Sequence, residues 1–124
     1  MDPLLLAKIA AVMLVLDGLW IYIVAGPAFF SMIPDIQGSA MRIRPGGAVV
    51  AYAAMVLLFN QFITADSTGW DAFVLGLLTY AIFDATNYAV FDNYDLKTAI
   101  VDTAWGGVLF WLTYNIIYKT AFAY

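Results

Sequence analysis

Hydrophobic residues along the chain fall into four long runs separated by short polar segments. Each run has about 20 residues, the length an α-helix needs to cross the hydrocarbon core of a bilayer. None shows the roughly ten-residue alternation of apolar and polar side chains that is typical of a membrane β-strand. The pattern therefore predicts membrane-spanning helices over residues 4–30, 47–63, 70–90 and 96–118.

These four runs predict an all-α membrane protein, a four-transmembrane-helix bundle in which residues 1–124 form a single domain. The longest polar segment follows the first run, where Pro27 marks the end of the helix. Pro34, Gly38 and Pro45 then predict a loop over Ser31 to Arg44, with Pro45 suited to the first turn of the second helix.

Four crossings place both termini on one side of the membrane and the first and third loops on the other. Arg42, Arg44 and Lys97 lie on the loop side, against Lys8 and Lys119 on the side of the termini. This small excess of basic residues on the loop side favours a cytoplasmic location for the first and third loops. The aromatic tail, residues 122–124, is suited to the headgroup region of the membrane.

Small residues indicate where helices could approach closely. Ala48, Ala51 and Ala54 recur at every third position of the second run, and Gly106 and Gly107 lie between bulky residues of the fourth. Such residues let the backbones of neighbouring membrane helices approach each other. We therefore expect both groups to serve in helix packing, and the glycine pair to pack rather than act as a hinge.

Composition narrows the possible chemistry. Of the 124 residues 65% are hydrophobic and 11% are charged, whereas soluble domains have about 25% charged residues. The chain has no Cys and no His, which argues against disulfides, thiolate chemistry and imidazole-bound metals, so we expect no cofactor and no metal. Its five basic residues are too scattered for nucleic-acid binding. Enzymatic activity is therefore less favoured than a non-enzymatic role.

Three aspartates, Asp17, Asp84 and Asp102, lie inside apolar runs. An ionised Asp at a membrane helix centre costs about 2.5 to 3.5 kcal/mol on insertion scales, so these side chains must face protein or water. Counted at about 1.5 Å per residue, all three lie in the half of the bilayer nearest the first and third loops. We therefore expect them to converge on one polar site.

Each aspartate has a polar or aromatic companion three residues further along its helix. Asp17 is followed by Trp20 and Asp102 by Trp105, whereas Asp84 is followed by Asn87, with Thr86 beside it. Spacing of three places each pair on one helix face. Two interpretations stay open for the cluster: a proton or cation site built from repelling carboxylates, or polar contacts that fix the helices without turnover.

Three short motifs in order resemble an uncharacterised family of small four-helix membrane proteins found in bacteria and in some large DNA viruses. The motifs are Asp17-x-x-Trp20, Asp84-x-Thr86-Asn87 and Val101-Asp102-x-Ala104-Trp105-Gly106. The resemblance covers nearly the whole chain and implies four transmembrane helices, in a bacterial inner membrane or in the membrane of a large DNA virus or its host. It implies no activity, although bacterial relatives can be encoded near lipid-modifying enzymes.

Three functions follow from these observations. The favoured one is a non-enzymatic structural or accessory component of a cellular or virion membrane, with the lipid bilayer as its partner and a homo-oligomer or larger assembly as a further expectation. The alternative is a proton- or cation-coupled carrier or small channel that uses the Asp cluster. The last is an accessory to membrane-lipid modification, for which the chain shows no nucleophile motif or cofactor fingerprint.

Overall fold

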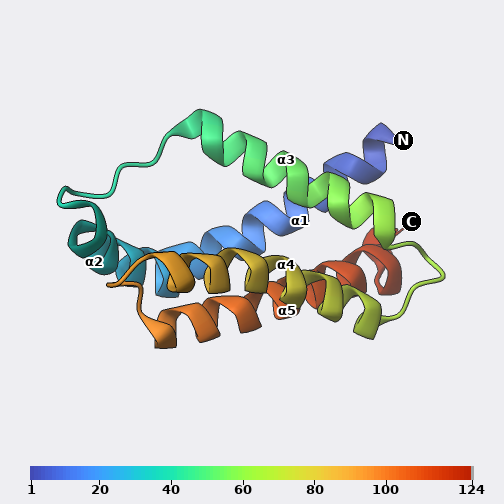
Figure 1. Ribbon diagram of the computed structural model, residues 1–124. Coiled ribbons are helices and arrows are strands. Elements are labelled where there is room, and N and C mark those ends of the chain that lie inside the picture. Colours follow the sequence, from blue (N-terminus) through green and yellow to red (C-terminus); the bar gives the residue numbers. More distant parts are fainter. Residues whose placement is uncertain (124) are drawn as a thin grey trace.

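The computed structural model describes residues 1–123, and every regular element in that part of the chain is a helix (Figure 1). Four helical stretches among them are long and apolar enough to cross a membrane, which confirms the predicted all-α bundle with four transmembrane helices. Tyr124, at the end of the predicted aromatic tail, lies outside the described residues. The elements are α1 Pro3–Trp20, the π-helical turn η1 Ile21–Ala25, α2 Gly26–Gln37, α3 Pro45–Phe62, α4 Gly69–Val90, α5 Leu96–Lys119 and the 3₁₀ turn η2 Ala121–Ala123.

The first helical stretch is longer than the sequence predicts. It continues without a break from Pro3 to Gln37, so the predicted helix end near Phe30 and the predicted loop over residues 31–37 were wrong. At about 1.5 Å per residue this stretch is roughly 50 Å long, well beyond a hydrocarbon core of about 30 Å. Its last part, α2, must therefore extend out of the core or turn along the membrane surface.

The turn η1 explains why Pro27 does not end the helix. A π-helical turn carries an extra residue and bends the helix axis. The backbone hydrogen bonds can therefore rearrange around a proline that follows the turn. Pro27 then stands in the first turn of α2, where its missing N–H is tolerated. A Cβ on Gly26 would lie 2.5 Å from the carbonyl oxygen of Ile21, so the bend requires glycine there. The helix ends at Gly38, whose φ of 75° is left-handed.

The other helix boundaries agree with the predicted ones to within about two residues. Pro45 begins α3, as predicted. Thr68 and Asp71 form a capping box at the start of α4, with hydrogen bonds of 3.1 and 2.7 Å between their side chains and backbone N–H groups. Asp95 caps α5 by accepting from the backbone N–H of Thr98 at 3.1 Å.

Helices α4 and α5 form a tightly packed hairpin, which is the most extensive helix–helix contact in the bundle. A Cβ on Gly76 would collide with the carbonyl oxygen of Gly106, and one on Gly106 would collide with the Tyr80 ring. A Cβ on Gly107 would lie 2.7 Å from the Phe73 ring. The predicted packing role of Gly106 and Gly107 is therefore confirmed.

Helices α1 and α3 pack on this hairpin and on each other (Figure 1). The main core lies toward the end of the bundle that holds the termini. Its fully buried side chains come from α1, α3, α4 and α5, and include Ile9, Met13, Phe59, Ala72, Leu109 and Phe110. Most of the remaining apolar side chains are exposed, as expected where lipid is the solvent.

The alanine stripe on α3 does not pack as predicted within the chain. Ala51 and Ala54 are exposed and Ala48 is only half-buried, whereas Val56 and Phe59 further along the helix are buried. The contact of α3 with α1 is therefore made mainly by its second half, together with one polar contact from Tyr52. Ala51 and Ala54 therefore lie on the exposed surface of α3.

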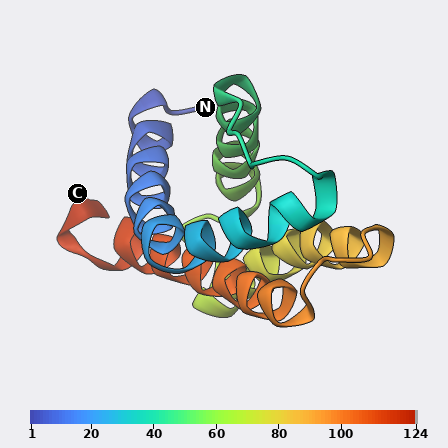
Figure 2. The same ribbon diagram turned by 90° about the vertical axis from the view of Figure 1, so that its left-hand side faces the viewer.

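Helix α2 turns sharply from α1 and runs across the loop end of the α4–α5 hairpin (Figure 2). A second, smaller core joins them, in which Met32 of α2 packs with Tyr94 and Ala99. The Asn93 amide donates to the carbonyl of Asp35 at 2.9 Å, and the Asp95 N–H donates to the Met32 sulfur at 3.2 Å. These contacts hold α2 against the loop at residues 91–95.

The arrangement of the helices predicts which loops share a side of the membrane. Both termini lie at the same end of the bundle as residues 63–68, and the loops at residues 38–44 and 91–95 lie at the other end (Figure 1). The chain has no cysteine, so single cysteines can be introduced for labelling at exposed positions. We expect Ser39→Cys and Ala65→Cys to react with a membrane-impermeant thiol reagent from opposite sides. Reaction of both from the same side would contradict the four-helix topology.

Candidate functional site: an intramembrane carboxylate cluster

Three buried carboxylates, one each from α1, α4 and α5, lie in the loop-side half of the bundle. Asp17, Asp84 and Asp102 are 6%, 1% and 8% exposed. A charged or polar side chain at membrane depth requires partners from the protein, because lipid offers no hydrogen bonds. The partners of the three aspartates differ, and this difference separates their roles.

Asp17 joins three helices. One carboxylate oxygen accepts a hydrogen bond from the indole N–H of Trp105 on α5 at 2.9 Å, and the other accepts one from the Tyr52 hydroxyl on α3. Both donors are neutral, so the carboxylate is held without a basic partner. Losing it would leave a phenol and an indole without an acceptor inside the membrane.

Asp84 joins the α4–α5 hairpin to its own loop. Its two oxygens accept from the Tyr94 hydroxyl at 2.9 Å and from the Thr103 hydroxyl at 3.2 Å. Burial and the neighbouring Asp84 carboxylate raise the pKa of the Tyr94 hydroxyl well above its usual range. Tyr94 therefore remains protonated at neutral pH and can keep donating to Asp84.

A stacked tryptophan pair lies between the aspartates. The rings of Trp20 and Trp105 are 4.8 Å apart at their centroids and 6° from parallel. Trp105 donates its N–H to Asp17, whereas the buried N–H of Trp20 has no hydrogen-bond acceptor among the described residues. The stack thereby couples α1 to α5 next to the carboxylates.

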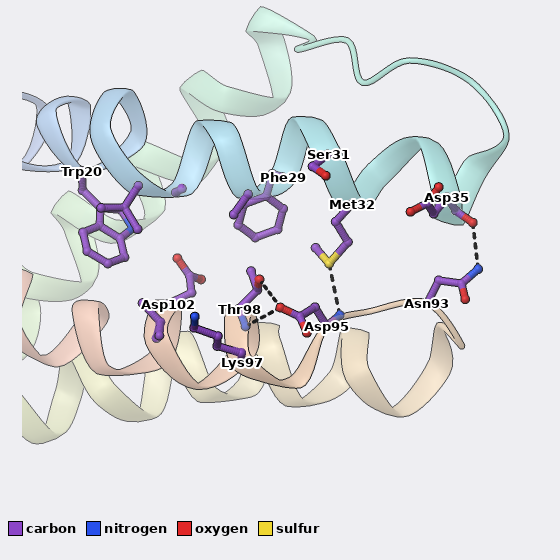
Figure 3. A pocket seen from close by; sticks show the side chains of 14 residues that line it. Trp20, Phe29, Ser31, Met32, Asp35, Asn93, Asp95, Lys97, Thr98 and Asp102 are labelled. Atoms are coloured by element: carbon purple, nitrogen blue, oxygen red, sulfur yellow. Dashed lines mark hydrogen bonds between the residues drawn. The ribbon is translucent and has the colours of Figure 1, made fainter.

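Asp102 differs from the other two aspartates. Its carboxyl group lies near the Asp84 carboxyl and the Trp20 indole, yet none of the hydrogen bonds among the described residues involves its side chain. Instead, Asp102 lines a cavity of about 500 Å³ between η1 and α2 on one side and the start of α5 on the other. Figure 3 shows its carboxylate directed into that space, with Trp20 and Phe29 opposite.

The mouth of this cavity is polar. Asp35, Asn93, Asp95, Lys97 and Thr98 line it near the 91–95 loop, and the deeper walls are formed by apolar and aromatic side chains. Hydrogen bonds from the side chain and backbone of Thr98 lower the pKa of Asp95, so that this exposed carboxylate is ionised at neutral pH. The cavity thus runs from charged groups at the loop end to the buried Asp102.

The structure brings together most of the predicted cluster. Each aspartate was expected to share a helix face with the residue three positions further along its own helix. The contacts themselves cross between helices: Asp17 accepts from Trp105 of α5, and Asp102 lies beside Trp20 of α1. Asn87 is half-buried near the Tyr94 hydroxyl, and Thr86 is exposed, so Thr86 does not join the cluster.

Sequence reasoning missed three donors, Tyr52, Tyr94 and Thr103. Tyr52 could have been predicted from the sequence, because a hydroxyl within an apolar run must find an acceptor inside the protein. Tyr94 lies in a loop, where its contact with a membrane-embedded carboxylate depends on tertiary structure alone. Among residues 1–123 no three acidic side chains are arranged to hold a metal ion.

A family model matches most of the chain. The model of a family described as "Predicted membrane protein (DUF2177)" matches residues 4–117, which includes all four transmembrane stretches almost completely. No curated protein and no solved structure matches the chain.

Proposed function

Because the chain belongs to the DUF2177 family of predicted membrane proteins, and is thus an integral multi-pass membrane protein, we propose that it serves as a non-enzymatic structural or accessory component of its membrane. That membrane is the bacterial inner membrane, or the membrane of a large DNA virus or its host. The observation that carries the proposal is the contact of Asp17 with Tyr52 and Trp105. A carboxylate that joins three helices through neutral donors fixes their positions and is not available for turnover.

Asp84 supports the same role. Both of its oxygens accept hydrogen bonds from hydroxyl groups, and its side chain is almost completely buried. A proton carrier would need an aspartate that water can reach from each side in turn. Asp84 is enclosed by Tyr94, Thr103 and the α4–α5 contact instead.

The packing of the other half of the bundle argues against a channel within one chain. The side chains of Ile9, Met13, Phe59, Leu109 and Phe110 fill the region toward the termini, and all five are fully buried. A water path through that region would require these side chains to separate, which would break the main core. The polar cavity therefore ends inside the membrane.

One observation favours the alternative, a proton- or cation-coupled carrier. Asp102 makes no hydrogen bond with a described residue and faces a cavity that is open at the loop end. An acidic group with this access can exchange a proton or bind a cation. Transport would still require a change of structure that opens the apolar half of the bundle.

A flux assay separates the two functions. We expect vesicles that contain the purified protein to leak protons, Na⁺ and K⁺ no faster than protein-free vesicles, because the apolar half of the bundle has no water path. Asp102→Asn should leave this background unchanged, as should Asp92→Asn, which alters an exposed loop aspartate. A flux that depends on the wild-type protein and is abolished by Asp102→Asn alone would establish the carrier and overturn the structural proposal.

A further inference from the structure

The cavity beside Asp102 combines a buried carboxyl group with aromatic and apolar walls. Asp102 is more than nine-tenths buried, and the indole N–H of Trp20 beside it makes no hydrogen bond of normal geometry with any described residue. An ionisable group placed this deeply without a partner is costly unless something else satisfies it. The cavity of about 500 Å³ in front of it is within the usual size range of small-molecule sites, which is roughly 300–1,000 Å³.

The charges around the cavity select for a cation. Three carboxylates line it, those of Asp35, Asp95 and Asp102, against the single amine of Lys97. Asp95 at the mouth is ionised at neutral pH, and hydrogen bonds from Thr98 lower its pKa further. An anion would be repelled from this entrance, whereas a cation would be drawn toward Asp102.

The walls favour an organic cation over a metal ion. Metal ions such as Ca²⁺ and Mg²⁺ require several oxygen ligands around one point, and no three acidic groups of the described residues converge in that way. The walls near Asp102 are formed by Trp20, Val24, Ala28 and Phe29. Aromatic rings attract ammonium groups, and the alanine and valine side chains suit the carbon atoms attached to such a group.

We propose that this cavity binds an organic ammonium group, which pairs with the Asp102 carboxylate while its carbon atoms lie against Trp20 and Phe29. The mouth lies near the helix ends and the 91–95 loop, which is where we expect the lipid headgroups to lie. Two sources can supply this chemistry there: the headgroup of an amino lipid such as phosphatidylethanolamine, or a free alkylamine from the water phase. The proposal goes beyond a structural role and holds whether or not the chain transports anything.

Two probes test the site and identify the source. In the first arm, delipidated protein in a maltoside detergent is titrated with n-butylammonium chloride, and thermal unfolding is compared with that in sodium chloride of the same concentration. Binding to the folded state should raise the unfolding temperature. In the second arm, native mass spectrometry compares retention of phosphatidylethanolamine with that of phosphatidylglycerol, which has no ammonium group.

Three variants assign the binding to the cavity. Asp102→Asn removes the charge with little change of shape and should weaken butylammonium binding by about tenfold or more. Ala28→Phe fills the cavity without changing its charge and should weaken binding as strongly, which keeps the test decisive if Asp102→Asn folds poorly. Asp92→Asn makes the same change of charge in the 91–95 loop but outside the cavity, and should bind like the wild type.

The outcomes separate as follows. Stabilisation by butylammonium together with selective retention of phosphatidylethanolamine, both lost in Asp102→Asn and Ala28→Phe, would support the proposal and identify a lipid headgroup. Stabilisation by butylammonium alone, lost in the same variants, would support it and identify a free amine. An absence of both effects in the wild type, or effects that persist unchanged in Ala28→Phe and Asp102→Asn, would overturn it.

Discussion

Replacement of Gly76 by alanine is expected to destabilise the protein by about 3 kcal/mol. The added Cβ would meet the carbonyl oxygen of Gly106 and would lie 2.6 Å from the ring of Phe110. The carbonyl belongs to the backbone and cannot rotate away, so α4 and α5 would have to separate along their whole contact. The free energy of unfolding, measured by denaturant titration in bicelles, gives this difference directly.

Gly18→Ala is the matched control. Gly18 is also in a helix, but no heavy atom of a neighbouring element lies within 4 Å of the position that its Cβ would take. The change should leave stability the same or raise it by up to about 1 kcal/mol, because alanine is the better helix former. Equal effects of the two substitutions would mean that α4 and α5 do not approach closely at Gly76.

Asp17→Ala is expected to cost about 2 kcal/mol of stability, because it leaves the Tyr52 hydroxyl and the Trp105 indole N–H without their acceptor. Asp102→Ala removes a carboxylate from the same half of the membrane and serves as the comparison. Asp102 has no hydrogen bond in the described structure to lose, so its removal should cost much less or should stabilise the bundle.

Unfolding free energies of both variants in bicelles test this contrast. We expect the unfolding free energy of Asp17→Ala to be well below that of the wild type, and that of Asp102→Ala to be close to it. If Asp102→Ala were the more damaging change, the roles assigned to the two aspartates would be reversed. Circular dichroism spectra that match the wild type would show that the helices are retained in each variant.

Hydrophobic runs predicted the four membrane-spanning helices because length and apolarity alone decide whether a segment can cross a bilayer. The same reasoning failed at residues 31–37. Prolines such as Pro27 and Pro34 are ordinarily signs of a helix end. Here the π-helical turn at residues 21–25 places Pro27 in the first turn of α2, and the helix continues past it. A local insertion of this kind depends on where the helix must bend, which hydropathy does not report.

The depth of the aspartates along their helices was sufficient to predict that they lie in one half of the bundle. Their partners could not be obtained in this way. Spacing of three residues placed Asp17 and Trp20 on one face of α1, yet the donor to Asp17 is Trp105 of α5, whose ring stacks on that of Trp20. Which donor reaches which carboxylate is set by the rotation of each helix about its axis, and that rotation follows from the glycine contacts of α5 and the core around Phe110.

The most direct test of the structural role is a double-mutant cycle between Asp17→Ala and Tyr52→Phe, with unfolding free energies measured in bicelles. The contact between α1 and α3 at this point predicts that the two substitutions together cost less than the sum of their separate effects, by about 1 kcal/mol. Strictly additive effects, with a coupling energy indistinguishable from zero, would contradict the claim that Asp17 holds the helices together.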